Sequence, residues 1–176
     1  MKVPLPVDPQ RFEFFTPAGG VPNNPRLALL LYSQIVPAGI VDRASYFERL
    51  FRANGWPPQW RWGMFDFDHY HPNTHEALGV FSGSAEVRLG GEQGRTIELR
   101  AGDALLIPAG VGHRALAAAD DFSMVGAYPT GYSPETLRDT EVDKLAAARR
   151  SIAALPTPCS DPVLGSGGLR RFWPSS

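Results

Sequence analysis

The sequence has one cysteine, Cys159, among its 176 residues. A single cysteine forms no intrachain disulfide and no thiolate cluster for zinc or an iron–sulfur centre, which fits a reducing cytoplasm. An excess of charge of one sign is also lacking, since the 17 Lys and Arg residues are balanced by 18 Asp and Glu residues, and neither sign forms a long run. This balance argues against nucleic acid and anionic membrane surfaces as partners and favours a small molecule.

Long apolar segments are absent as well. The run from Leu27 to Tyr32 is far shorter than the roughly 18 residues that suggest a membrane span. Three prolines interrupt the first nine residues, where a signal peptide needs a continuous apolar stretch. We therefore expect a cytoplasmic protein without membrane contact, and the length favours one domain over residues 1–176.

Glycine and proline are abundant, with 18 and 17 residues. They divide the first 130 positions into short apolar segments, a pattern typical of β-sandwiches and barrels. The GGEQGR stretch between Val87 and Ile97 predicts a hairpin loop. The predicted strands are 28–35, 60–70, 76–81, 85–89, 96–99, 104–107, 113–117 and 122–128.

Two helices are expected beside the strands. The first begins after Asp42 as N-cap and ends at Asn54-Gly55. The second covers about 140–154 and ends before Pro156, with Val142, Leu145, Ala146 and Ile152 along one side. The remaining tail has no clear periodicity, and it is open whether it covers the barrel or a neighbouring subunit.

Three of the four histidines, His69, His71 and His75, fall within seven residues. Side chains alternate along a strand, so His69 and His71 point the same way, and Glu76 begins the next apolar segment on the same side. Two imidazoles and a carboxylate suit a divalent transition metal. The alternative is a group of polar histidines beside a turn.

These residues resemble the two sequence motifs of the cupin family. The first motif is filled by Gly63, His69, His71, Glu76 and Gly83, with the four-residue spacer of germin-like members. The second is filled by Gly102, Pro108, Gly110 and His113, and Ala117 stands where the family has Asn.

The resemblance spans about residues 60–130 and implies an all-β fold, the cupin double-stranded β-helix or jelly-roll barrel, with a few peripheral helices. A helical and irregular C-terminal extension would follow at about 133–176. The resemblance further implies one divalent metal (Fe, Mn, Ni, Zn or Cu) on His69, His71, Glu76 and His113. It also implies a homodimer.

His75 is ambiguous, because it neighbours Glu76 and points to the opposite face if the strand has begun. It is an alternative metal ligand, a group that supports a ligand or shuttles protons beside the metal, or a surface histidine. Strand alternation places Asp66, Asp68 and Tyr70 outward. The predicted lining of the pocket is Phe65, Phe67, Leu78, Val80 and Ala115, with Met124 and Tyr128 on one choice of phase for the last strand.

A metal-dependent enzyme acting on a small organic molecule is the leading interpretation of this pattern. Cupins with such sites include dioxygenases, isomerases and decarboxylases, and the apolar lining favours a dioxygenase. A non-catalytic module that binds or senses a small ligand, with a structural metal, is the alternative, since no acid or base beyond the ligands is evident. A metal-free barrel is a third possibility.

Overall fold

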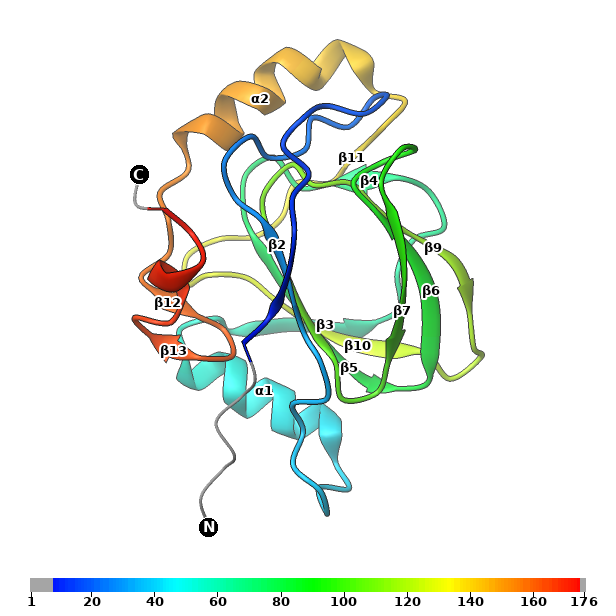
Figure 1. Cartoon of the computed structure of the whole chain (residues 1–176), viewed down its shortest axis with the longest axis vertical. Coiled ribbons are helices and arrows are strands. Elements are labelled where there is room, and N and C mark those ends of the chain that lie inside the picture. Colours follow the sequence, from blue (N-terminus) through cyan, green and yellow to red (C-terminus); the bar gives the residue numbers. More distant parts are fainter. Residues whose placement is uncertain (1–7, 175–176) are drawn as a thin grey trace.

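Two antiparallel sheets form the body of the protein, and the computed structural model describes residues 8–174 of it (Figure 1). The larger sheet consists, in order, of β1 (Gln10–Phe12), β2 (Leu29–Tyr32), β8 (Ala104–Ile107), β5 (Glu76–Ser82), β10 (Ser123–Ala127) and β3 (Pro58–Trp62). The smaller sheet consists of β11 (Leu137–Arg138), β4 (His69–Tyr70), β9 (His113–Ala118), β6 (Ser84–Leu89) and β7 (Arg95–Arg100). This architecture confirms the predicted all-β jelly roll.

The space between the sheets is filled by alternate side chains of both. Leu78 and Leu105 from the larger sheet pack with Val87, Leu89 and Leu99 from the smaller one, and all five are buried. Alternation along each strand produces this arrangement, because every second residue faces the partner sheet. The predicted hairpin between β6 and β7 is present, with Ser84 paired to Arg100 and Leu89 to Arg95.

The predicted strand over residues 60–70 is wrong. The chain leaves the larger sheet after Trp62 and enters the smaller sheet only at His69, so the two halves belong to different sheets. Residues 63–68 cross between them without regular structure. The alternating apolar and polar residues of this stretch imitate a strand, but its phase cannot be carried across the crossing.

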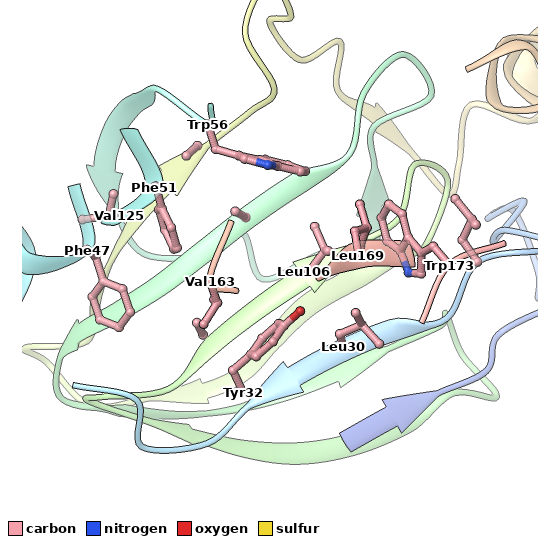
Figure 2. Packing of buried hydrophobic residues seen from close by; sticks show 14 of the residues in the cluster. Leu30, Tyr32, Phe47, Phe51, Trp56, Leu106, Val125, Val163, Leu169 and Trp173 are labelled. Atoms are coloured by element: carbon pink, nitrogen blue, oxygen red, sulfur yellow. The ribbon is translucent and has the colours of Figure 1, made fainter. Parts of the chain in front are cut away.

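The first helix agrees with prediction. α1 (Arg43–Ala53) follows Asp42, whose side chain accepts a hydrogen bond from the Ser45 amide and caps the helix. Its buried residues Phe47 and Phe51 pack on the outer face of the larger sheet (Figure 2). The predicted second helix is split into a 3-10 turn, η1 (Val142–Lys144), and α2 (Leu145–Ala154).

The apolar side predicted for the second helix is only partly right. Ala148 and Ile152 are its buried residues, whereas Val142 is 65% exposed. The change from 3-10 to α geometry rotates the face, since the two helix types differ in residues per turn. Taken together, none of the helices described over residues 8–174 has the length and apolar character required to cross a membrane.

The C-terminal tail packs on the barrel of its own chain. It forms a hairpin of β12 (Ser160–Asp161) and β13 (Gly165–Ser166), followed by the 3-10 turn η2 (Leu169–Arg171). Trp173 is buried against the core and donates a 2.8 Å hydrogen bond from Nε1 to the Ala28 carbonyl (Figure 2). Asp161 accepts a hydrogen bond from the buried Tyr32 hydroxyl. The tail therefore covers the barrel of its own chain, one of the two alternatives that the sequence left open.

Candidate metal centre

Three histidines converge between the two sheets. His69 in β4 lies directly opposite His113 in β9, and their rings are 4.0 Å apart between centroids. His71 follows β4 by one residue. The ligand atoms of His69, His71 and His113 all lie within 4.8 Å of one another, and all three side chains are buried. This spacing suits three imidazoles that share one metal ion.

Backbone carbonyls hold the three rings in one orientation. Nδ1 of His69 faces the Phe67 carbonyl at 3.1 Å, Nδ1 of His71 faces that of Glu135 at 2.9 Å, and Nδ1 of His113 faces that of Val111 at 3.0 Å. A carbonyl oxygen only accepts, so each Nδ1 carries the proton and donates. Each Nε2 is thereby directed into the cluster, the arrangement typical of histidine ligands to metals.

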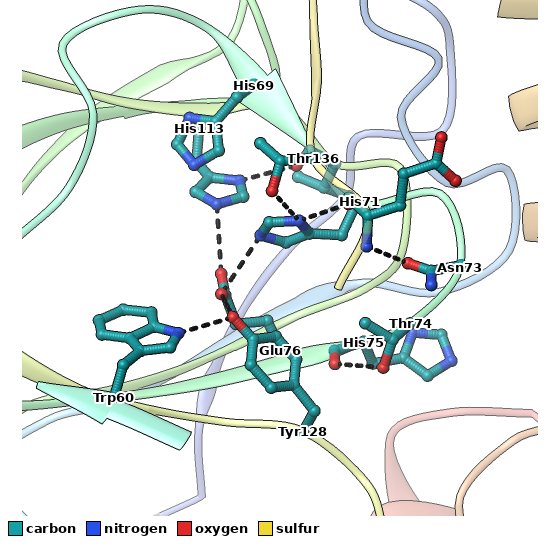
Figure 3. Close-up of polar contacts among 12 residues, drawn as sticks. Trp60, His69, His71, Asn73, Thr74, His75, Glu76, His113, Tyr128 and Thr136 are labelled. Carbon is teal, nitrogen blue, oxygen red and sulfur yellow. Dashed lines mark hydrogen bonds and ion pairs between the residues drawn. The ribbon is translucent and has the colours of Figure 1, made fainter. Parts of the chain in front are cut away.

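Glu76 reaches the cluster from the opposite sheet, because it is the first residue of β5. Its Oε2 lies 3.2 Å from Nε2 of His71, and its Oε1 lies 3.2 Å from Nε2 of His113 (Figure 3). The structure therefore brings together all four residues predicted as ligands, with the carboxylate joined to two of the three imidazoles.

The cluster divides into neutral and charged members. Burial and the neighbouring His113 lower the pKa of His69 to about 2, so this imidazole is neutral. Burial opposes ionisation of both His71 and Glu76, but their mutual attraction outweighs it. The pKa of His71 is raised and that of Glu76 is held well below its usual range. The contact thus favours the ionised form of the pair, in which a proton occupies Nε2 of His71, where a metal would bind.

A short chain of hydrogen bonds supports the carboxylate from below. The Tyr128 hydroxyl donates to Oε2 of Glu76 at 2.7 Å, and Nε1 of Trp60 donates to the Tyr128 oxygen at 2.8 Å (Figure 3). Because Trp60 occupies an acceptor position of the hydroxyl, the Tyr128 proton is directed at Glu76. Burial and the Glu76 charge raise the pKa of Tyr128, so the hydroxyl keeps its proton.

The four residues lie at one side of a cavity of about 230 Å³. Of the predicted lining, Phe65, Leu78, Met124 and Tyr128 do line it. Phe67, Val80 and Ala115 do not. Phe67 stacks against Phe65, and the Arg138 guanidinium lies 3.8 Å from the centre of the Phe67 ring. Val80 is part of the closed core between the sheets. The complete lining is Trp60, Trp62, Gly63, Met64, Phe65, His69, His71, Glu76, Leu78, His113, Met124, Tyr128, Pro134 and Thr136.

Several lining residues were not predicted, because the phase of strand alternation does not carry across the irregular crossing at residues 63–68. Trp60 and Trp62 are not part of the predicted lining, yet both face the cavity and Trp62 is 54% exposed. Pro134 and Thr136 come from the segment before β11, which carries no periodic pattern. Their only signal is their position after β10, where the chain returns to the barrel mouth.

His75 takes no part in the cluster. Its Nδ1 accepts a 2.9 Å hydrogen bond from the Ala109 amide, and its ring packs edge-on against Trp173 with 4.8 Å between centroids. It points away from Glu76, as strand alternation predicts, but it is buried and not a surface histidine. Burial lowers its pKa to about 4, so it is neutral. The structure makes it a packing residue between the Pro108–Gly110 turn and the tail.

Asp68 and Tyr70 face away from the ligands, as strand alternation predicts, but unlike Asp66 they are not exposed to solvent. Asp66 is exposed, whereas Asp68 is buried and its Oδ2 accepts a hydrogen bond from Arg88 on β6. Tyr70 packs with Val21, Leu137 and Ala148. The outer face of the smaller sheet is therefore covered by α2 and the segment before β2, a cover that local alternation does not predict.

The donor set fits a divalent transition metal. Three imidazoles and one carboxylate, all buried, are a typical set for Fe, Mn, Ni, Zn or Cu once His71 has given up any proton on Nε2. The hydrogen bonds from the three Nδ1 atoms and from Tyr128 supply the outer support that such ligands require. Such a metal would act as a Lewis acid or bind a small oxygen-containing molecule.

Comparison with known proteins gives consistent results. The family model described as "Cupin domain" matches residues 63–125. The uncharacterized protein YjlB of Bacillus subtilis (strain 168) is 36% identical over 154 residues, which are 86% of this chain and 88% of that protein.

Among solved structures, a DUF861 family protein from Thermotoga maritima matches with 20% identity and a TM-score of 0.37, over 56% of this chain and 96% of that one. An oxalate decarboxylase matches with 20% identity and a TM-score of 0.36, over 63% of this chain. The chain spans 23% of the length of that oxalate decarboxylase.

Proposed function

Because this chain belongs to the cupin superfamily, we propose that it holds one divalent transition metal on His69, His71, Glu76 and His113. We further propose that it is an enzyme whose metal acts on a small organic molecule in the adjoining cavity. The observation that carries the proposal is the common orientation of the three imidazoles. Each Nδ1 is bound to a backbone carbonyl and each Nε2 is left for a shared ligand.

The cavity supports a catalytic role over a purely structural one. A structural metal site is closed by protein ligands, whereas this cluster borders a cavity of about 230 Å³. A substrate placed there would meet the ligand cluster on one side and apolar side chains on the others. The chain's own residues would orient that substrate and exclude water around it.

Among the reaction types known for such sites, we propose a dioxygenase as the first to test, with isomerase and decarboxylase as alternatives. Apart from the four ligands, Tyr128 is the one titratable side chain among the lining residues, and its raised pKa keeps it protonated. These residues therefore provide no general base for reactions that need one at neutral pH. The metal supplies a site for oxygen binding when it is bound.

The same scarcity of acid–base groups supports a second candidate, a non-catalytic protein that binds or senses a small ligand. The two differ in one measurement. An enzyme turns over its ligand when metal is present, whereas a binding protein returns it unchanged. Oxygen consumption and product analysis on a metal-loaded sample, repeated without oxygen, separate a dioxygenase from both the oxygen-independent enzymes and the binding protein.

The metal proposal is tested by elemental analysis of protein purified without chelator or affinity tag. We expect about one transition-metal ion per chain in the native protein, and loss of most of it in His71→Ala and in Glu76→Ala. Circular dichroism should show that both variants remain folded. Native protein that holds no metal after incubation with each of the five candidate ions would refute the proposal.

A further inference from the structure

We propose that the cavity beside the ligand cluster takes an uncharged compound with a single aromatic ring and an oxygen donor, held by Trp62 and Phe65 with its oxygen towards the histidines. This inference rests on the proposed function and narrows it to a substrate class. Its basis is the distribution of charge, polarity and aromatic rings around the cavity.

The lining contains no lysine or arginine side chain to recognise an anion. No Lys or Arg is among the 14 lining residues, and the one acidic side chain among them is Glu76. A small carboxylate or phosphate would have to pair with the metal alone, next to the Glu76 carboxylate. Proteins that recognise such anions usually supply Arg or Lys. The cavity is therefore suited to a neutral molecule.

Polar groups are confined to the side of the ligand cluster. Glu76 and Tyr128 lie there, and the Thr136 hydroxyl is 3.4 Å from Nδ1 of His71 (Figure 3). The remaining walls are Trp62, Met64, Phe65, Leu78, Met124 and the ring of Trp60. A molecule with one oxygen-bearing end and an otherwise apolar body matches this division.

A series of aromatic rings in contact leads to the cluster, with Phe65 stacked on Phe67 and Trp62 tilted against Phe65. The ring centroids of Trp62 and Phe65 are 4.9 Å apart, those of Phe65 and Phe67 are 4.7 Å apart and nearly parallel, and Phe65 meets the edge of His69 at 5.1 Å. Arg138 covers the far side of Phe67. Arg138 therefore covers this series of rings at Phe67, and the aromatic surface open to a ligand belongs to Trp62 and Phe65.

The exposure of this surface distinguishes it from the rest of the core. Trp62 is 54% exposed and Phe65 is 39% exposed, although both line the cavity. The Phe65 backbone is held in place because its carbonyl accepts a 2.9 Å hydrogen bond from the Ala115 amide. Rings that are fixed and still accessible bind a planar partner at low entropic cost.

The size of the cavity sets the size of the ligand. A closed apolar cavity of about 150 Å³ holds benzene. The cavity here is about 230 Å³, which accommodates one substituted aromatic ring. The geometry thus points to a phenol-like compound.

Fluorine NMR with para-fluorophenol as the probe tests this inference. We expect the zinc-loaded protein to bind the probe, and cyclohexanol, which has the same hydroxyl and similar size but no aromatic ring, to compete roughly tenfold less well than phenol. Oxalate, an anion that binds metals, should fail to displace the probe at concentrations that leave zinc in place.

The variants Phe65→Leu and Trp62→Leu should weaken probe binding about three- to tenfold without changing zinc content. Phe15→Leu is the matched control, because Phe15 is 37% exposed and lines a different cavity. Thermal unfolding should be similar for all three variants.

The two proposals fail in different ways. If zinc is retained but cyclohexanol competes as well as phenol, or Phe65→Leu and Trp62→Leu bind the probe like Phe15→Leu, the aromatic inference is wrong and the metal proposal stands. If the native protein holds no metal under any condition, the proposed function is wrong, whatever the probe does.

Discussion

The Tyr128 hydroxyl donates a 2.7 Å hydrogen bond to Oε2 of Glu76, the carboxylate that also contacts His71 and His113. Tyr128 thus fixes the one ligand that comes from the larger sheet. Outer groups of this kind typically change metal affinity about 10- to 100-fold when they are removed. We expect Tyr128→Phe to bind zinc about tenfold more weakly than the native protein in a competition titration with a chromophoric chelator.

The control for this variant is Tyr46→Phe. Tyr46 lies on α1, far along the chain from the cluster, and its ring packs edge-on against Phe47. Each variant removes one tyrosine hydroxyl, so a general effect of this change on folding should appear in both. Equal zinc affinity of Tyr128→Phe, Tyr46→Phe and native protein would show that Glu76 needs no support from Tyr128.

Gly126 provides the space in which Trp60 reaches Tyr128. A Cβ atom at Gly126 would lie 2.0 Å from Cε2 of the Trp60 indole, so the ring cannot stay where it is in Gly126→Ala. We expect a loss of about 1–3 kcal/mol of stability, the usual cost of overpacking, together with a shift in Trp fluorescence. Gly63→Ala is the control, since its nearest neighbour would be 3.9 Å away, and it should melt like the native protein.

The ligand cluster could be predicted from the sequence because its members are local or belong to a fixed motif. His69, His71 and Glu76 are separated by short spacers, and strand alternation alone places the two histidines on one face. Alternation also places His75 opposite Glu76. These inferences depend on two or three residues at a time, and such short-range geometry is set by the backbone.

The surroundings of the site could not be predicted in the same way. Phe67 was assigned to the pocket because residues 60–70 alternate, but the chain changes sheets between Trp62 and His69. The burial of Asp68 and Tyr70 depends on contacts with Arg88, Leu137 and Ala148, far away in the sequence. A local pattern carries no information about which distant segment covers a face.

Metal binding should depend on pH through His71. Burial alone would lower the pKa of this imidazole, but the attraction of Glu76 raises it above 6.5, and the metal must displace its proton. His69, with a pKa near 2, and Glu76, with a lowered pKa, are already deprotonated at neutral pH. Zinc affinity should therefore rise with pH until His71 is neutral and then level off.

Calorimetry in buffers of different ionisation enthalpy measures the protons released. We expect protons to be released from His71 when zinc binds at pH 6.5, and fewer of them at higher pH. The folding stability of the metal-free protein should depend on pH in the opposite sense to its zinc affinity. A raised histidine pKa stabilises the fold below pH 6.5, and this contribution is lost as the pH rises through the raised pKa. Zinc binding without proton release at pH 6.5 would contradict the ionised His71–Glu76 pair.

His75 and His113 should respond differently to the same substitution. His113→Ala removes a nitrogen of the cluster, so zinc content should fall. His75→Ala leaves the cluster intact but deprives the Ala109 amide of its acceptor, a loss of about 1–3 kcal/mol for a buried group. We expect His75→Ala to melt at a lower temperature and to keep its zinc. Loss of zinc from His75→Ala at a temperature where it is folded would return His75 to the list of ligands.

Trp173 connects the stability of the C-terminal tail to that of the barrel. Its ring is buried beside His75, and Nε1 donates to the carbonyl of Ala28, the residue immediately before β2. Replacing a buried Trp by Ala typically costs about 3–5 kcal/mol, so Trp173→Ala should lower the free energy of unfolding by that order in urea. The effect should reach the whole barrel, because the tail and the larger sheet share one core. A native-like melt of the barrel with selective proteolysis of residues 156–174 would instead mean that the tail unfolds independently.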